Sequence, residues 1–242
     1  MKRLNVNIIV ALILTLILAM IVVYSREFEG LLYRYFSTKN TTGSRTPLLV
    51  YFGQHIWMVL VSSVIAVGIE LGLGIFATTK TGEDFRDPLL KVVNLGQAFP
   101  SPALLALVVP ILGYGHEGAL IALVVYALMP IVYNVVVGIE EVAEDVVDAA
   151  IGMGMTPFHL YRKIKIPLAM NVILGGIRTA LVINISAATL AAAVGAGGLG
   201  VLVVNGVRTF DMVLILQGAI PVTIMAVIVE LLLKEVQARL SF

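Results

Sequence analysis

The sequence contains no cysteine and little charge. Only 13% of its 242 residues are Asp, Glu, Lys or Arg, against roughly 25% in soluble domains. The lack of cysteine excludes disulfides, thiolate metal sites and cysteine nucleophiles, and the three histidines are widely scattered along the chain. A formal net charge of +1 provides no basic surplus for binding nucleic acid. With 60% hydrophobic residues, the composition predicts an integral membrane protein.

Long apolar stretches recur along the whole chain. A helix needs about 20 mostly apolar residues to cross the hydrocarbon core of a bilayer. The first stretch is longer than the core of a signal peptide and ends without an Ala-x-Ala-like cleavage site, so we expect a retained anchor. The third is interrupted by Pro100, Pro102 and Pro110, which favour kinks. The sequence therefore predicts an all-α membrane protein with a single domain, residues 1–242, and six spans: 5–24, 57–77, 92–112, 119–138, 168–194 and 212–233.

The distribution of Lys and Arg predicts the orientation of these spans. An even number of spans places both termini on one side of the membrane. Ten Lys and Arg residues fall in the terminal segments and in the connections on that side, whereas five fall in the connections on the other side. Because cytoplasmic segments carry the excess of Lys and Arg, we expect both termini in the cytoplasm, together with the connection 140–167.

The connection 140–167 is the only long polar segment in the second half of the chain. Val142, Val146 and Met153 recur there at helical spacing, which predicts an amphipathic helix. The acids that occupy its other face lie toward its N-terminal end, where the helix dipole favours negative charge. These acids are Glu141, Glu144, Asp145 and Asp148.

A second short helix is expected after a glycine turn. Gly152 and Gly154 allow the backbone to turn. Thr156 is a suitable N-cap, and Pro157 fits the first position of a helix. We expect Pro167 to end this second helix before the fifth span begins. The prediction is a helix, a turn and a helix that project into the cytosol, with an ordinary solvated loop as the alternative.

The stretch DAAIGMGMTPFHLYRKIKIP, which ends at Pro167, resembles the EAA motif of permeases of ABC importers. That motif consists of E-A-A, a glycine six residues after the acid, and a closing I-x-L-P. The matching positions are Asp148, Ala149, Ala150, Gly154, Ile164 and Pro167. The chain departs from the pattern in having Asp148 in place of Glu and Ile166 in place of Leu. The connection 140–167 is called the EAA loop below.

The resemblance implies a type I importer permease in the cell (inner) membrane, whose EAA loop forms a coupling helix that docks on a cytoplasmic ATPase. Because the chain has no G-x-x-x-x-G-K-[ST] phosphate loop, we expect it to be no enzyme and to bind no cofactor itself, with ATP and Mg bound by the ATPase subunit. The implied partners are two ATPase subunits, a second permease chain, either a copy or a relative, and an extracytoplasmic solute-binding protein. The implied coupling residues are Asp148, Ala149, Ala150, Gly154, Met155, Thr156, Pro157, Ile164 and Pro167.

The resemblance extends over most of the region from Ala98 to Val229. The segments FPSPALLALVVPILGYG, YALMPIVYN, GIRTALVINISAATLAAAVGAGGLG and LQGAIP are similar in order and spacing to permeases for glycine betaine, choline or carnitine. The implied substrate is an osmoprotectant of this kind. Another small solute, such as methionine or taurine, remains the alternative within the same class.

Several polar residues fall inside the predicted spans. A carboxylate at this depth is costly unless it faces protein or water, so we predict that Glu70 pairs with Arg178. Asn184, Ser186 and Thr189 either hold helices together or line a path for the solute. In a proton-coupled secondary carrier, the alternative from a different class, Glu70 would be the central site.

The glycine-rich segment GAGGLG, residues 195–200, formally matches the dinucleotide fingerprint G-x-G-x-x-G. It follows a membrane span rather than a strand of a βαβ unit, so we exclude a nucleotide site. We expect a close-packed turn at the outer end of the fifth span.

Overall fold

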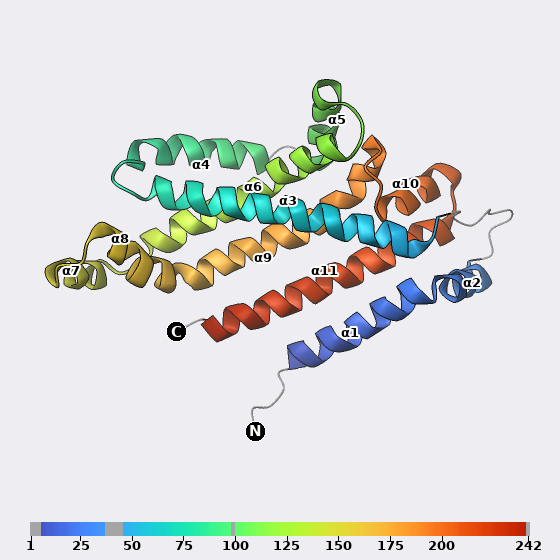
Figure 1. Ribbon diagram of the computed structural model, residues 1–242, viewed down its shortest axis with the longest axis horizontal. Coiled ribbons are helices and arrows are strands. Elements are labelled where there is room, and N and C mark those ends of the chain that lie inside the picture. The colour runs from blue at the N-terminus through green and yellow to red at the C-terminus, as the bar shows by residue number, and fades with distance from the viewer. Residues whose placement is uncertain (1–5, 37–45, 98–99, 241–242) are drawn as a thin grey trace.

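The computed structural model describes residues 6–36, 46–97 and 100–240, and within these ranges all regular structure is helical. The longer helices run side by side along the long axis and form an elongated bundle (Figure 1). The helices in chain order are α1 Val6–Val23, α2 Ser25–Tyr35, α3 Leu48–Ala77, α4 Glu83–Gln97, α5 Ser101–Leu112, α6 His116–Glu140, α7 Glu144–Gly152, α8 Pro157–Leu160, the π-helix η1 Tyr161–Lys165, α9 Ile166–Leu190, the 3-10 helix η2 Ala191–Val194, α10 Gly200–Thr209 and α11 Met212–Leu240.

Five described helical segments are long and apolar enough to cross a membrane. They are α1, α3, α6, the continuous helix Pro157–Val194 and α11. These segments coincide with five of the six predicted spans, although the start of the first, at residue 5, lies outside the described residues. Helix α3 begins at Leu48, nine residues earlier than predicted, because the stretch 48–56 is mostly apolar and contains no proline.

The third predicted span, 92–112, is not one helix. It is divided between α4 and α5, with residues 98–99 outside the described part. Pro100 and Pro102 lack the backbone N–H that a continuing helix needs, and α5 has 12 residues, which at 1.5 Å per residue is about 18 Å. Figure 1 shows α4 and α5 following one another alongside α6. The two shorter helices take the place of the single predicted span.

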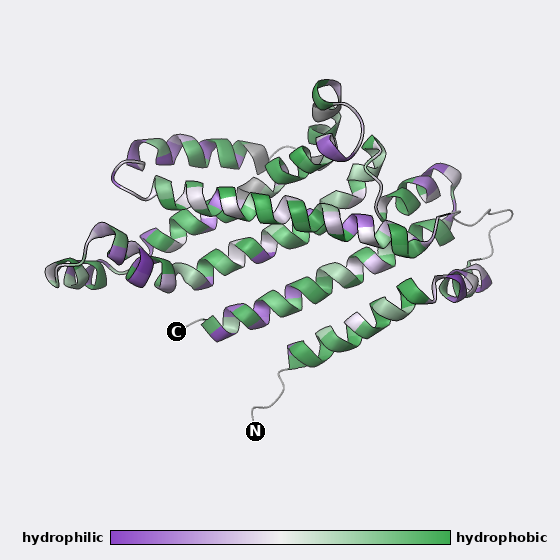
Figure 2. Cartoon of the chain, viewed as in Figure 1, coloured by the Kyte–Doolittle hydropathy of each residue, from purple (hydrophilic) through white to green (hydrophobic). Residues whose placement is uncertain are grey.

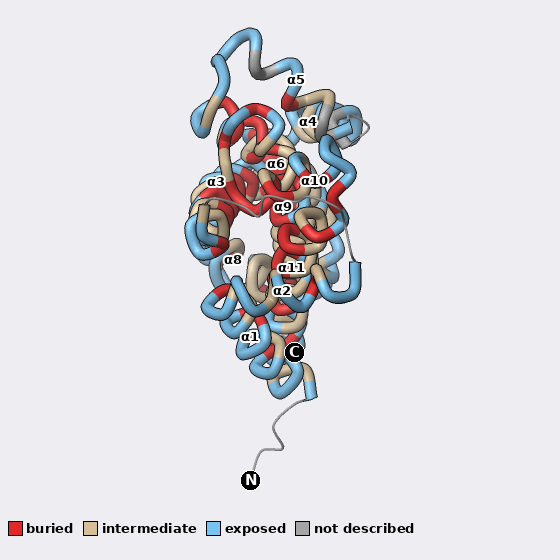
Figure 3. Tube along the Cα trace, turned by 90° about the vertical axis from the view of Figure 1, so that its right-hand side faces the viewer, coloured by how far each residue is buried: buried red, intermediate tan, exposed pale blue. Residues whose placement is uncertain are grey.

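Helices α3, α6 and α9 form the centre of the bundle, where glycines allow close packing. A Cβ atom on Gly74 of α3 would lie 2.6 Å from the Cβ of Val135 on α6, and one on Gly176 of α9 would lie 2.8 Å from the Cβ of Asn134. Small residues at such positions let membrane helices approach closely. Figure 3 shows the buried segments concentrated in this part of the molecule, whereas α1 is largely exposed.

Hydrophobic residues line most of the long helices, and hydrophilic residues are more frequent near the two ends of the molecule (Figure 2). Figure 2 shows hydrophobic residues along α1, α3 and α11, and more hydrophilic segments at α2 and around α7 and α8.

Helices α7, α8 and η1, residues 144–165, are called the knob. The start of α1 and the end of α11 point toward the end of the molecule that carries the knob (Figure 1), as six crossings predict.

The glycine-rich segment is a packed turn, as expected. Gly195, Gly197 and Gly198 have φ values of +81°, +81° and +78°, a region that residues with a side chain rarely adopt. The backbone N–H of Gly198 donates a hydrogen bond of 2.9 Å to Oε1 of Gln54 on α3. The turn therefore joins the end of η2 to α10 and is fixed to the start of α3.

Candidate functional site

The turn after α7 explains the need for Gly154. The backbone N–H of Met155 bonds to the carbonyl of Ala150 at 3.1 Å, and that of Gly154 bonds to the carbonyl of Ile151 at 2.9 Å. These two bonds form a Schellman motif, which places a left-handed residue after the helix, and Gly154 has φ +79°. A Cβ atom here would meet no atom within 4 Å. Glycine is therefore required by the backbone conformation rather than by lack of space.

The second short helix begins as predicted. Thr156 has an extended backbone and is the N-cap of α8, with Pro157 as the first helical residue. The side-chain Oγ1 of Thr156 accepts a hydrogen bond from the backbone N–H of His159 at 3.4 Å and lies 2.9 Å from the Nδ1 atom of the same residue. This capping satisfies a free N–H of the first turn and fixes the direction in which α8 leaves the glycine turn.

Pro167 does not end a helix, contrary to the prediction. Helix α8 continues through the π-helix Tyr161–Lys165 directly into α9, where Pro167 lies in the first turn. In a regular α-helix the missing N–H of Pro167 would leave the carbonyl of Lys163 without a partner and the ring would clash with it. The wider π turn, in which the N–H of Ile166 bonds to the carbonyl of Tyr161, accommodates the proline. The knob is consequently joined to α9 by one uninterrupted helix of 38 residues.

Two contacts fasten the knob and its neighbours to the bundle. The hydroxyl of Tyr161 donates a hydrogen bond to the backbone carbonyl of Thr78, at the C-terminal end of α3. Nε of Arg86 on α4 lies 2.9 Å from Oε1 of Glu140, at the end of α6. The latter pair is partly exposed and contributes little stability, but it places α4 next to the start of the EAA loop.

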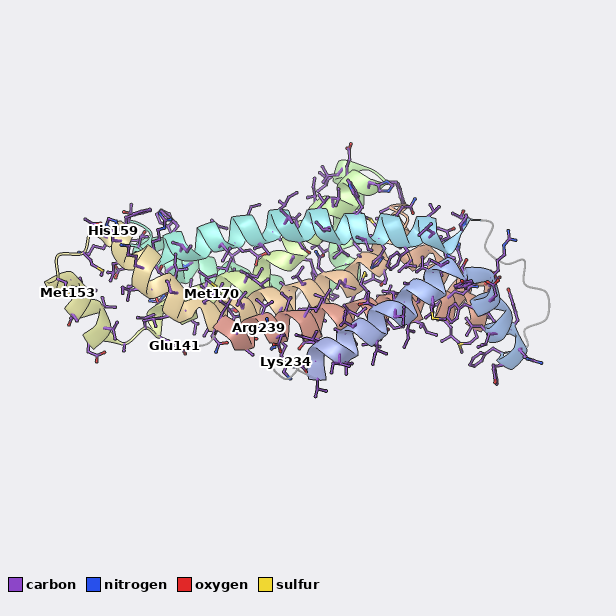
Figure 4. The ribbon with its side chains drawn as sticks, turned by 60° about the horizontal axis from the view of Figure 1, so that its bottom comes forward. Glu141, Met153, His159, Met170, Lys234 and Arg239 are labelled. Carbon is purple, nitrogen blue, oxygen red and sulfur yellow. The ribbon has the colours of Figure 1, made fainter. Side chains whose placement is uncertain are left out.

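The knob presents exposed apolar side chains. Met153 is 72% exposed, Phe158 is 67% exposed, and Ile151, in the last turn of α7, is 54% exposed. Figure 4 shows Met153 and His159 at the end of the molecule that carries the knob, and Lys234 and Arg239 farther back, near the C-terminal end of α11. The amphipathic pattern placed Met153 on an apolar face but did not identify Met153 or Phe158 as contact residues. The signal was available in the sequence as large apolar residues flanking a glycine turn in a polar segment.

The residues predicted from the EAA motif lie in the knob, its glycine turn and the first turn of α9, and they differ in burial. Ala150 is 1% exposed, whereas Met155, Ile164 and Pro167 are half-buried. The remaining predicted coupling residues are exposed: Asp148, Ala149, Gly154, Thr156 and Pro157.

The predicted pair of Glu70 and Arg178 does not form. Nε of Arg178 lies 3.5 Å from Oε1 of Glu230 on α11. Glu70 is fully buried, and in the described part of the chain neither of its carboxylate oxygens has a hydrogen-bond partner. Which side of α9 carries Arg178 is decided by the packing of three helices, and depth in the membrane alone could not reveal it.

Asn184 joins α9 to α3. Its Nδ2 atom donates hydrogen bonds of 2.8 Å to Oγ of Ser62 and to Oγ of Ser63, and all three side chains are buried. One helical position further on, the carbonyl of Ile185 lies 3.2 Å from Nε2 of the buried His55. Of the two roles considered for Asn184, the structure therefore supports helix packing.

Ser186 and Thr189 take a different position from Asn184. The hydroxyl of Ser186 is exposed and donates to the carbonyl of Val182 at 3.2 Å, and the half-buried Thr189 donates to the carbonyl of Ser186 at 2.6 Å. Both hydroxyls are satisfied within their own helix and lie away from the α3 contact. The residues predicted for a solute path are thus split between a buried packing contact and an open face of α9.

The family model that matches this chain covers residues 70–241 and describes the binding-protein-dependent transport system inner membrane component. The chain belongs to this family. The match spans the EAA loop, the polar groups of α9 and all of α11, and the permease fold predicted from the EAA motif is confirmed.

Similar proteins support the same assignment. The carnitine transport permease protein OpuCB of Listeria monocytogenes is 39% identical over 80% of this chain and 88% of the relative. The glycine betaine/carnitine/choline transport system permease protein OpuCB of Bacillus subtilis (strain 168) is 35% identical over the same shares. A chain of the methionine ABC transporter MetNI, solved in inward-facing conformations, has a TM-score of 0.73 and 20% identity over 84% of this chain and 100% of that chain. At this identity the structural similarity shows the fold, which is that of a type I importer permease.

Proposed function

We propose that this chain is the membrane-spanning subunit of an ATP-driven importer and that its knob binds the ATPase subunit. The observation that carries the proposal is the exposed apolar surface of the knob around Met153 and Phe158. Exposed apolar patches of this kind mark contact sites for other proteins. The knob also continues into α9 without a break, so a movement of the knob acts directly on a helix at the centre of the bundle.

The orientation follows from this role. An ATPase that uses cellular ATP and Mg lies in the cytoplasm, so the knob and both termini would face the cytoplasm, in agreement with the excess of Lys and Arg on that side. The opposite end, with α2, α10 and the glycine turn, would then face the extracytoplasmic solute-binding protein. Two permease chains and two ATPase subunits complete the proposed complex.

The proposed solute is an osmoprotectant such as glycine betaine. Support comes from relatives named for carnitine, choline and glycine betaine transport, which are 35–39% identical over about four fifths of the chain. The chain also covers most of the length of each of these relatives. The similarity to the methionine transporter is limited to the fold and does not favour methionine.

The test is solute uptake by the complete importer in proteoliposomes. This permease is reconstituted together with its proposed ATPase and solute-binding protein, with ATP inside or outside the vesicles as orientation requires. The expected result is uptake of labelled glycine betaine, carnitine or choline that requires ATP, the ATPase and the binding protein.

Two outcomes contradict the proposal in different ways. Uptake by this chain alone, driven by a proton gradient, would indicate a secondary carrier. Uptake of methionine with none of the three quaternary ammonium solutes would leave the class intact and refute the substrate. Vesicles with an ATPase that binds ATP but does not hydrolyse it serve as the matched control.

A further inference from the structure

Polar side chains form a stripe on one open face of α9 and α11. Thr179 and Ser186 on α9 and Thr223 on α11 are exposed, and each hydroxyl bonds only to a carbonyl of its own helix in the described structure. Toward the knob end of the same two helices, Nε2 of Gln237 donates to the carbonyl of Asn171 at 2.8 Å. Polar side chains on membrane-spanning helices commonly face water or another protein.

Arg178 and Glu230 lie within this stripe and are its only described ionised groups that pair across the two helices. Their side chains remain 27% and 42% exposed. The two other ion pairs in the described ranges, Arg86 with Glu140 and Arg239 with Glu235, have distances of 2.9 Å, whereas Arg178 Nε and Glu230 Oε1 are 3.5 Å apart. At that distance the two groups attract one another but do not satisfy each other's hydrogen bonds.

A loose, open ion pair inside membrane-spanning helices is expensive unless water or a ligand reaches it. Ionisable residues at this depth typically face a water-filled cavity and mark the path of a substrate. A pair that served only to hold α9 against α11 would be expected to be closed and shielded from solvent. The pair between Arg178 and Glu230 is neither.

We propose that Arg178 and Glu230 form a charged subsite in the translocation path that receives a zwitterionic quaternary ammonium solute. The carboxylate of the solute binds the guanidinium of Arg178, and its ammonium group faces the carboxylate of Glu230. The inference rests on the proposed function, because it requires that the importer carries solutes of this class.

The chemistry of the two residues fits the two ends of such a solute. A guanidinium presents several N–H donors in a planar fork that matches a carboxylate. A quaternary ammonium group has no N–H, so it needs only a nearby negative charge, which the exposed Glu230 provides. Arg178 and Glu230 already attract each other. The binding free energy of the solute is therefore only the difference between its contacts with the two residues and the contact that they make with each other. That difference favours weak, transient binding, which suits a solute that must leave the path again.

The test compares a zwitterion with a cation in the complete reconstituted importer. Glycine betaine carries both an ammonium and a carboxylate group, whereas choline lacks the carboxylate. Arg178→Gln removes the partner of the carboxylate, and the ratio of glycine betaine to choline uptake should fall about tenfold, equivalent to about 1.4 kcal/mol. Glu230→Gln removes the partner of the ammonium group, and the ratio should move in the opposite direction because choline depends on that charge alone.

A double variant and a control variant test whether the changes in uptake reflect a general loss of folding or insertion. Arg178→Gln combined with Glu230→Gln leaves no uncompensated charge and should insert normally while binding both solutes with little preference. Arg239→Gln breaks another ion pair on α11 and should keep the ratio of the unaltered protein. Abundance in the membrane and ATPase activity without solute report on folding.

The outcomes separate this inference from the proposed function. Parallel losses of both solutes in each variant, with an unchanged ratio in the double variant, would show a purely structural ion pair and overturn the subsite. An unaltered importer that takes up neither solute would instead refute the proposed function before any variant is compared.

Discussion

The hydroxyl group of Tyr161 donates a hydrogen bond to the backbone carbonyl oxygen of Thr78. The bond joins the π-helix at the base of the knob to the C-terminal end of α3, two segments that lie 83 residues apart in the chain. π-Helical turns commonly occur at functional sites. This bond is therefore the place where a movement of the knob would be transmitted to the bundle.

Replacing Tyr161 with Phe should weaken coupling without preventing assembly. The loss of one hydrogen bond costs about 0.5–1.5 kcal/mol, while Met153 and Phe158 stay available for the ATPase. We expect normal copurification of the ATPase but less solute imported per ATP hydrolysed, measured in proteoliposomes. Tyr133→Phe on α6 is the control, since no hydrogen bond of its hydroxyl is found among the described residues. Equal transport efficiency in both variants would contradict a role for the Tyr161 bond.

Gly154→Ala and Gly152→Ala should differ, although both glycines are open to solvent. A Cβ atom at either position meets no atom within 4 Å, but only Gly154 has a positive φ. A left-handed conformation costs a residue with a side chain about 1–2 kcal/mol, so Gly154→Ala should disturb the turn and reduce ATPase binding. Gly152→Ala lies in the last turn of α7 and should bind normally. Affinity for the purified ATPase subunit, measured in detergent, decides between them, and equal affinities would show that the turn is not needed.

Local signals in the sequence predicted the knob well. Gly154, Thr156 and Pro157 act through their own backbone geometry and nearest neighbours, so their roles could be read without the fold. The prediction that Pro167 ends a helix is wrong, because the effect of this proline depends on the helix that precedes it. A proline ends a regular α-helix, but the π turn of Tyr161–Lys165 removes the clash, and nothing in the sequence pattern indicated that turn.

The interior of the membrane part was harder to predict. Depth along a span suggested that Glu70 and Arg178 could meet, but the rotation of each helix about its own axis decides which side chains face one another. The packing of Gly176 against Asn134 and of Asn184 against Ser62 turns Arg178 toward Glu230. Likewise, the split of the span 92–112 depends on the prolines around residue 100, whose presence favoured a kink but did not distinguish it from a complete break.

Charged substitutions on the apolar surface of the knob should prevent assembly with the ATPase. Met153→Asp and Phe158→Asp each place a charge where an apolar side chain is 72% or 67% exposed, and burying an unpaired charge in an interface is strongly unfavourable. We expect normal insertion and loss of copurification of the ATPase subunit. Phe210→Asp is the matched control, because Phe210 is 91% exposed beyond α10, at the opposite end from the knob. Retention of the ATPase by both knob variants would show that it binds elsewhere.

Asn184→Ala should destabilise the permease more than Ser186→Ala. Asn184 is buried and provides two hydrogen bonds from α9 to α3, and interhelical hydrogen bonds in membrane proteins contribute about 0.6 kcal/mol each, up to about 1.7. The empty space left by the shorter side chain adds to the loss. Ser186 is exposed and bonds only within α9, so its replacement removes no contact between helices. The midpoint of thermal unfolding in detergent should fall by several degrees for Asn184→Ala and stay nearly constant for Ser186→Ala. Equal midpoints would mean that the bonds to Ser62 and Ser63 do not hold α9 against α3, and the positions of Arg178 and Glu230 would then need another support.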